Sequence, residues 1–463
     1  MVREPELRRA LGFWAAISIV IGTVIGSGIF RVPSEMVRAT GSPGMVFAVW
    51  IFGGILSLFG ALTYAELSAM MPEAGGEYVY LSAAYGPFLG FVYGWTQTWV
   101  AKSASIAALA TLFATYLGDF FPALNGTVVT IPLPIGPDWK PLDIRWEQIA
   151  AIGAILLVAA GNYRGVRLGG NAQVILTALK IAVIAGIIVA AMFSRAARPG
   201  NLRSATSAVP GGFSGFFKAL VAALWAYDGW NNAGMLGSEV HRPGRNFPRA
   251  VIGGTLAVIA VYLAANLAYF TVLDSSQVAS SSRVAADMMR RIAGPRGGAL
   301  VSMAVMISIL AALNGSLLSG SRVPFAMARD GYFFRPVSRV HPSFRTPSAG
   351  IGLLGFWSCL VLLSGHYDEL YTLVIFPSWI LYALTASSVI VLRRKLPEAE
   401  RPYRVPGYPA VPILFVMVAG LLLYSTLLSS PRESAIGFAV ILAGVPFYRY
   451  WRANLPSGSD NRG

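Results

Sequence analysis

A glycine-rich stretch interrupts the first apolar segment of the sequence, Gly22-Thr23-Val24-Ile25-Gly26-Ser27-Gly28. Each glycine weakens a helix by about 0.8–1 kcal/mol relative to alanine. Opening a helix inside a bilayer also frees backbone groups that find no water there. The N–H groups at residues 27–29 would then begin a second half-helix, whose positive end suits a carboxylate. The alternative is a continuous helix in which Gly22 and Gly26 only let a neighbouring helix pack closely.

A second interruption, Trp225 to Asn232, lies at the centre of the sixth apolar segment and contains Asp228. A lone carboxylate inside a membrane is costly, so it is by default functional or paired. Asp228 could bind a cationic ligand group, cap a half-helix or pair with a neighbouring lysine. The carbonyl groups freed at Ile21 to Val24 and Trp225 to Tyr227 carry negative partial charge. We expect them to bind an ammonium group.

Lys180 is the third candidate, because it lies near the middle of an apolar segment that spans residues 170–193. At about 1.5 Å per residue it is roughly 15 Å from the start of that helix. From there a lysine cannot easily extend to either surface, so it must face the protein interior and find partners or lose its proton. Extension toward the lipid surface is the alternative. Substitution of Lys102 or Lys218, which lie in or near other apolar segments, is expected to matter less.

The composition assigns the chain to the membrane proteins. Of its 463 residues, 55% are hydrophobic and 12% are charged, whereas soluble chains carry about 25% charged residues. Loop arginines on one side of the membrane explain the net charge of +15 better than nucleic-acid binding does. With one cysteine, Cys359, no disulfide framework is possible. We find no pattern for catalytic residues, a cofactor or a metal, and therefore expect no enzyme.

Twelve apolar segments are long enough to cross a bilayer, so we predict an all-α polytopic protein with one transmembrane domain over residues 1–463. Lys and Arg are in excess in the loops on the side of the N-terminus, which places both termini in the cytoplasm. The predicted spans are 10–30, 44–71, 86–117, 147–162, 170–193, 213–237, 249–273, 297–321, 348–364, 370–392, 409–429 and 434–451.

The two interrupted spans each come first in a run of five, an arrangement typical of inverted repeats with a binding site between them. The repeats would cover about 10–195 and 212–395, with two further helices over about 405–452. A channel or ion-pathway subunit is the competing class. It would need a continuous polar stripe, whereas only spans 1, 6 and 8 are interrupted.

Five stretches together resemble the L-type amino acid transporter family of the amino acid–polyamine–organocation superfamily. They are Ile21 to Phe30; Tyr64 to Leu67 with Pro72 and Gly75 to Leu81; Trp225 to Glu239; Pro243 to Ala250; and Asn314 to Arg322 with Ala328 to Gly331. The resemblance implies alternating-access transport of an amino acid by a twelve-span chain with five-plus-five inverted repeats. It also implies that Trp225 covers the substrate as a gate.

The resemblance further implies that Lys180 points at the break in span 1, where sodium-coupled relatives of the fold hold sodium. We therefore expect sodium-independent transport, by exchange or linked to protons. Trp225 favours small or medium neutral amino acids such as Ala, Ser or Thr; the alternative is a cationic amino acid or polyamine bound by Asp228. The predicted substrate-binding residues are Ile21, Thr23, Val24, Gly26, Ser27, Gly28, Trp225, Ala226, Tyr227 and Asp228, with Lys180 as the coupling residue.

Animal members of the family pair with a glycoprotein through a disulfide from the loop after span 3. The corresponding loop, about 118–146, contains no cysteine, so we expect no disulfide-linked partner subunit. The expected partners are the amino acid substrate and the lipid bilayer. Short tails and an Ala-, Gly- and Arg-rich composition favour a bacterial inner membrane. We expect Glu66 and Glu239 to be structural and to cap helices or pair with arginines.

Overall fold

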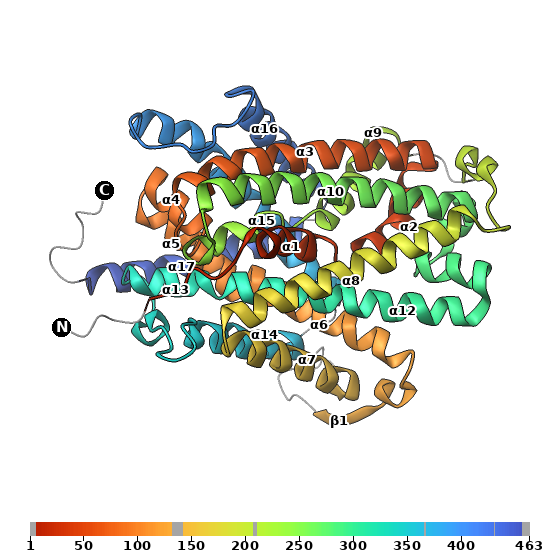
Figure 1. Cartoon of the computed structure of the whole chain (residues 1–463), viewed down its shortest axis with the longest axis horizontal. Helices are drawn as coiled ribbons and strands as arrows, with labels where there is room; N and C mark the ends of the chain where they lie inside the picture. Colours follow the sequence, from red (N-terminus) through yellow and green to blue (C-terminus); the bar gives the residue numbers. More distant parts are fainter. Residues whose placement is uncertain (1–5, 132–141, 207–210, 365–366, 430, 456–463) are drawn as a thin grey trace.

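The computed structural model describes residues 6–131, 142–206, 211–364, 367–429 and 431–455, and these are almost entirely α-helical (Figure 1). The helices are α1 (Phe13–Val24), α2 (Gly28–Thr40), α3 (Pro43–Met70), α4 (Glu77–Tyr85), α5 (Pro87–Thr96), α6 (Lys102–Gly118), α7 (Trp146–Tyr163), α8 (Val166–Met192), α9 (Gly212–Ala226), α10 (Pro243–Val272), α11 (Ser275–Ser280), α12 (Val284–Gly320), α13 (Arg322–Arg329), α14 (Ser348–Ser364), α15 (Tyr367–Lys395), α16 (Ala410–Ser429) and α17 (Pro431–Ala453).

An α-helix lies at the position of every predicted span, although in span 6 it covers only the first half, and this confirms the all-α polytopic class. Within the described residues, eight segments are long and apolar enough to cross a membrane: Phe13–Thr40, Pro43–Met70, Pro87–Gly118, Val166–Met192, Pro243–Val272, Val284–Arg329, Phe376–Lys395 and Ala410–Leu428. Two shorter apolar helices, Gly212–Ala226 and Ser348–Leu363, occupy predicted spans 6 and 9. The other two predicted spans correspond to α7 and α17.

The first span is broken where the glycine-rich stretch predicts. Helix α1 ends at Val24 and α2 begins at Gly28, and Ile25 between them has a non-helical ψ of 86°. The second half-helix continues to Thr40, ten residues past the predicted end of the span. Gly22 is also a packing residue, because a methyl group there would overlap the amide of Gln173 and lie 2.5 Å from Thr177 Oγ1 on α8. The break and the close packing therefore coexist.

The sixth span differs from the prediction in its second half. Helix α9 ends at Ala226, and the chain continues in turns and two 3-10 segments, Asn232–Met235 and Gly237–Glu239. Gly229 has a φ of +113°, and a Cβ there would lie 3.1 Å from Thr23 Oγ1. Thr23 Oγ1 donates to the Gly229 carbonyl at 2.9 Å. A residue without a side chain thus lets the two broken spans touch.

One element was not predicted. The loop after α6 holds a small antiparallel hairpin, β1 (Thr127–Ile131) with β2 (Leu142–Arg145), which projects from the bundle in Figure 1. The remaining short elements are a π-helical turn, Gln97–Ala101, between α5 and α6, and 3-10 turns at Pro122–Asn125, Pro199–Arg203 and Arg335–Ser338.

Helix α1 lies in the centre of the bundle (Figure 1) and packs against α8, α10 and α12. Nine of its twelve residues are buried, so its polar backbone groups at the break must find partners in the protein. Two ion pairs join distant parts of the chain: Glu239 binds Arg322 at 2.7 Å with both side chains buried, and the buried Glu66 binds the partly exposed Arg393 at 2.6 Å. The expectation that Glu66 and Glu239 pair with arginines is confirmed.

Candidate functional site

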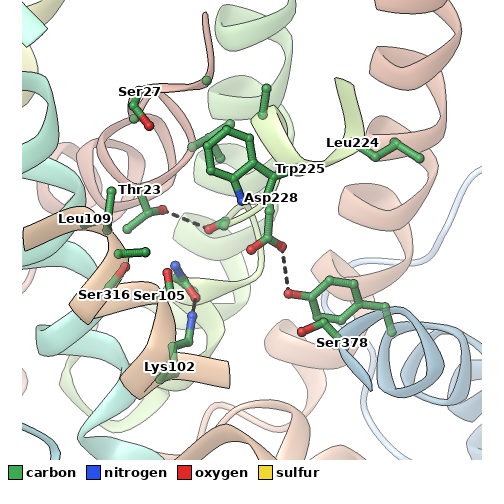
Figure 2. Close-up of a pocket in the computed structure, with 18 of the residues that line it drawn as sticks. Thr23, Ser27, Lys102, Ser105, Leu109, Leu224, Trp225, Asp228, Ser316 and Ser378 are labelled. Carbon is green, nitrogen blue, oxygen red and sulfur yellow. Dashed lines mark hydrogen bonds between the residues drawn. The ribbon is translucent and has the colours of Figure 1, made fainter. Parts of the chain in front are cut away.

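A polar cavity lies between the two broken spans, with a volume of about 80 Å³, enough for several water molecules. Figure 2 shows Thr23 and Ser27 on the side of the first span, Trp225 and Asp228 on the side of the sixth, and Lys102 and Ser105 opposite them. The lining residues are Thr23, Val24, Gly26, Ser27, Gly28, Lys102, Ser105, Ala108, Leu109, Leu224, Trp225, Ala226, Asp228, Gly229, Asn232, Ser316, Ser378, Trp379 and Tyr382.

Eight of the ten residues predicted to bind substrate line this cavity, and Ile21 and Tyr227 do not. The Tyr227 side chain turns away, and its hydroxyl donates to the Trp50 carbonyl at 3.1 Å. Ile21 is buried in the apolar core of the bundle, and its carbonyl accepts from Ile25 N–H at 2.9 Å. Both side chains belong to the packing around the cavity, and binding of an ammonium group by their backbone carbonyls stays a prediction.

The start of α2 offers hydrogen-bond donors to the cavity. The first N–H groups of a helix have no intrahelical acceptor, and at α2 these belong to Gly28 and Ile29 beside the helix-capping residue Ser27. The Ser27 hydroxyl is buried and has no hydrogen-bond partner. A buried hydroxyl without a partner is unfavourable, so it is available to a ligand. Sequence analysis assigned a role only to the Ser27 backbone.

The freed carbonyl groups are less available than the sequence indicated. The Tyr262 hydroxyl lies 2.9 Å from the Val24 carbonyl and 2.7 Å from the Ala226 carbonyl, so it joins the ends of α1 and α9. The Trp225 carbonyl accepts from Asp228 N–H at 3.1 Å. An ammonium group that binds these three carbonyls must therefore share them with groups of the protein.

Asp228 and Lys102 place opposite charges at the cavity (Figure 2). Asp228 Oδ1 accepts from the Tyr382 hydroxyl at 2.7 Å, and the Lys102 ammonium donates to the Asn232 side-chain carbonyl. Lys102 lies close enough to interact electrostatically with Asp228. Among the described residues no lysine lies within ion-pair distance of Asp228, so its direct partner is the Tyr382 hydroxyl and not a lysine. Lys102, to which sequence analysis gave a minor role, is a residue of the site.

Lys180 lies on the opposite side of α1, within α8, and is 1% exposed. Its ammonium donates to the carbonyl of Gly22 at 2.9 Å and also to that of Ile25. The Ser308 hydroxyl lies 3.0 Å from the Ile25 carbonyl and 3.1 Å from the Gly26 carbonyl. One ammonium and one hydroxyl thus satisfy the carbonyls opened by the break. Lys180 points at the break as expected, and extension to the lipid surface is excluded.

Several residues of the site could not be found from the sequence, namely Lys102, Tyr262, Ser308 and Tyr382. The tyrosines and the serine lie in apolar segments, where such residues are ordinary, and Lys102 was noted in a span but not assigned to the site. The position of a residue along a helix does not show which neighbouring helix its side chain contacts. Asn231-Asn232, which begins three residues after Asp228, was the clearest available signal, because adjacent amides inside a span require partners. Within the described residues no group of three or more His, Cys, Asp or Glu could hold a metal.

Two broken spans that meet at a cavity with charged and hydroxyl side chains, in a bundle of membrane-length helices, are typical of a transporter with a central site. The sequence comparisons agree, since the chain matches the amino acid permease family model over residues 11–448. The chain belongs to this family, which confirms the resemblance to the amino acid–polyamine–organocation superfamily.

The relatives of the chain are transporters and exchangers, not enzymes. The serine/threonine exchanger SteT of Bacillus subtilis is 34% identical over 453 residues, which cover 96% of this chain and 97% of SteT. The human b(0,+)-type amino acid transporter 1 is 32% identical, with 96% of this chain and 89% of the relative covered. The human cystine/glutamate transporter is 30% identical, with 96% and 85% covered. The chain is therefore an amino acid transporter of the permease family.

Proposed function

We propose that the chain is a sodium-independent exchanger of small neutral amino acids in a bacterial inner membrane. It works by alternating access between inverted repeats over about 10–195 and 212–395, with both termini cytoplasmic. The observation that carries the substrate class is the balanced charge of the cavity, one carboxylate and one ammonium. A zwitterion with an uncharged side chain adds no net charge to it. The similarity to a serine/threonine exchanger supports the same substrate class.

In this proposal the substrate carboxylate binds the start of α2, at the N–H groups beside Gly26, Ser27 and Gly28 and at the Ser27 hydroxyl. The ammonium group binds at the ends of α1 and α9, next to Asp228. Trp225 and Leu224 limit the length of the side chain. Lys180 takes the place of a coupling sodium ion, because its ammonium already satisfies the carbonyls of the break.

Uptake into proteoliposomes tests the function. Labelled L-serine should accumulate when the vesicles contain unlabelled L-serine, at the same rate in sodium, potassium or choline buffer. A strict requirement for sodium would overturn the role of Lys180. Equal uptake into empty and preloaded vesicles would exclude exchange in favour of net transport.

A cationic substrate is the second candidate, because Asp228 is partly exposed to the cavity. A competition screen with all twenty amino acids separates the two. We expect Ala, Ser and Thr to displace labelled serine and Arg and Lys to be weak. Displacement by Arg and Lys alone would make Asp228 a substrate ligand and refute the neutral class.

A further inference from the structure

Glu77 differs from the other buried glutamates of the described chain. Glu66, Glu77 and Glu239 are all at most 1% exposed. Glu66 and Glu239 bind arginine guanidinium groups, whereas no Lys or Arg lies within ion-pair distance of Glu77 among the described residues. A buried carboxylate without a counter-charge is strongly disfavoured, so such a group usually takes up a proton. A structural ion pair therefore does not account for the buried carboxyl group of Glu77.

The fold places Glu77 next to the chain segment that follows the break in span 6. Gly75 and Gly76 both have positive φ, and a Cβ at Gly76 would lie 2.9 Å from Met235 N. Gly75 N–H donates to the Met235 carbonyl at 3.0 Å. Two glycines therefore allow the loop to touch the 3-10 segment after the break, and α4 begins there with Glu77 as its first residue.

The carboxyl group of Glu77 has incomplete hydrogen bonding. Oε1 accepts from the Asn231 side-chain amide, and Oε2 is buried without a partner. The hydroxyl groups of Tyr64, Tyr80 and Tyr93 interact electrostatically with this carboxyl, and Tyr93 is close enough to donate to it when it is ionised. A protonated Oε2 would act as a donor toward these oxygens, whereas an ionised one would accept from them. Both charge states thus have partners available.

Within the described part of the chain, no guanidinium group stabilises the ionised form. Tyr64 comes from α3, Tyr80 from α4, Tyr93 from α5 and Tyr382 from α15, and among the described residues the cation near the carboxyl is Lys102 of α6. The arginines of α13 are engaged elsewhere: Arg322 binds Glu239, and Arg329 lies over the Phe325 ring. Lys395 of α15 donates to the Ala84 carbonyl. Burial raises the pKa of the Glu77 carboxyl.

Adjacent residues of the break connect Glu77 to the cavity. Asn231 holds the Glu77 carboxyl, and Asn232 holds the Lys102 ammonium, which lines the cavity. Lys102 interacts electrostatically with both Glu77 and Asp228. With Glu77 ionised these three side chains carry a net negative charge, and with Glu77 protonated they are neutral. A substrate carboxylate entering the cavity is repelled less in the second state.

We propose that Glu77 is a proton-binding site linked to occupancy of the cavity, so that binding of an amino acid is accompanied by uptake of a proton at Glu77 Oε2. The inference rests on the proposed amino acid transport. The proton comes from water on the side to which the site is open. By linkage, a ligand that favours the protonated state must bind more tightly as the pH falls.

Calorimetric titration of the purified protein with L-serine tests the proposal. Titrations at a series of pH values, each in two buffers with different ionisation enthalpies, give the number of protons taken up on binding. We expect net uptake by the wild-type protein and affinity that falls by up to tenfold per pH unit above the Glu77 pKa. Glu77→Gln should bind serine with pH-independent affinity and take up no proton. Glu73→Gln, an exposed carboxyl in the preceding loop, should behave like the wild type.

A second variant gives a test that does not depend on the folding of Glu77→Gln. Asn231→Ala removes a donor to the ionised carboxylate, so the pH at which affinity falls should move upward. Serine binding without proton uptake at every pH of the series in the wild type would overturn the proposal, as would unchanged pH dependence in Glu77→Gln. Absence of binding by any of the twenty amino acids would instead refute the proposed function.

Discussion

Gly26 and Gly28 lie two residues apart, yet their surroundings differ. A Cβ at Gly26 would have its nearest neighbours 3.9 Å away, at Ala312 and Leu109. A Cβ at Gly28 would lie 2.7 Å from Ala226 Cβ and 3.0 Å from Ala226 Cα. Gly26 therefore leaves room for a ligand, and Gly28 lets the start of α2 touch the end of α9.

These contacts predict different effects for substitutions at Gly26 and Gly28, two positions that look equivalent in the sequence. Gly26→Leu should fold normally and lose serine binding, because its side chain occupies the cavity. Gly28→Ala should lower stability by about 1–3 kcal/mol, the usual effect of overpacking. Thermal unfolding and equilibrium binding in detergent measure both. Normal serine affinity in Gly26→Leu would contradict the proposed carboxylate site.

The Ser27 hydroxyl should contribute to affinity without being essential. Ser27→Ala removes one hydrogen bond to the ligand, worth about 0.5–1.5 kcal/mol, or roughly two- to tenfold in Kd. Ser34→Ala is the control, since Ser34 is buried in the same helix and its hydroxyl donates to the Arg31 carbonyl at 3.0 Å. An equal effect of both substitutions on binding would show that Ser27 acts only through folding.

At the scale of elements, α8 presents a row of buried polar side chains to α1. Gln173 and Thr177 donate to the Ser18 carbonyl at 3.2 and 3.1 Å, and Lys180 donates to the Gly22 carbonyl one turn further along. These hydrogen bonds hold the C-terminal half of α1 against α8. Movement of α1 relative to α8 must therefore break or re-form these contacts.

Lys180→Ala should reduce serine exchange by at least about tenfold, equivalent to roughly 1.4 kcal/mol. The substitution leaves the carbonyls of Gly22 and Ile25 without their cation. Lys218→Ala is the matched control, because Lys218 is exposed in α9. Proteoliposome exchange with equal amounts of inserted protein measures the effect. Equal rates in the two variants would contradict a coupling role.

The Glu239–Arg322 ion pair joins the turn after span 6 to the start of α13, with both side chains fully buried. Glu239→Gln leaves the guanidinium uncompensated and should lower stability by about 3–5 kcal/mol. Glu35→Gln, which removes an exposed pair with Arg31, should change stability by about 1 kcal/mol or less. Thermal unfolding in detergent compares them. A similar Tm for both variants would show that the buried pair contributes little.

At the scale of the whole molecule, the described chain begins and ends at the same end of the bundle (Figure 1). Leu7 packs near Ala74 and Phe325, and Leu455 approaches Gly331, so both ends lie near α13. Affinity tags at both termini should be protected from protease added to intact cells and cleaved in inverted vesicles. Cleavage of either tag in intact cells would refute the cytoplasmic placement.

The sequence by itself determined the membrane class, the positions of the helical spans, the break at residues 22–28 and the family. These follow from local composition, because a bilayer requires long apolar helices and any interruption in them stands out. The sequence also determined the orientation of Lys180, since a lysine in the middle of a span cannot easily reach either membrane surface and must face the protein interior.

Only the tertiary structure decided which side chains meet at the breaks. Lys102, Tyr262 and Tyr382 come from three separate spans, and their partners depend on how helices pack, which apolar segments do not encode locally. The same reason explains why Tyr227 faces Trp50 instead of the cavity. In the sequence, Glu77 stood out only as part of the Gly75 to Leu81 stretch that resembles the family. Its lack of an arginine partner is visible only when every buried charge has been placed, because pairing across a fold is a property of the whole packing.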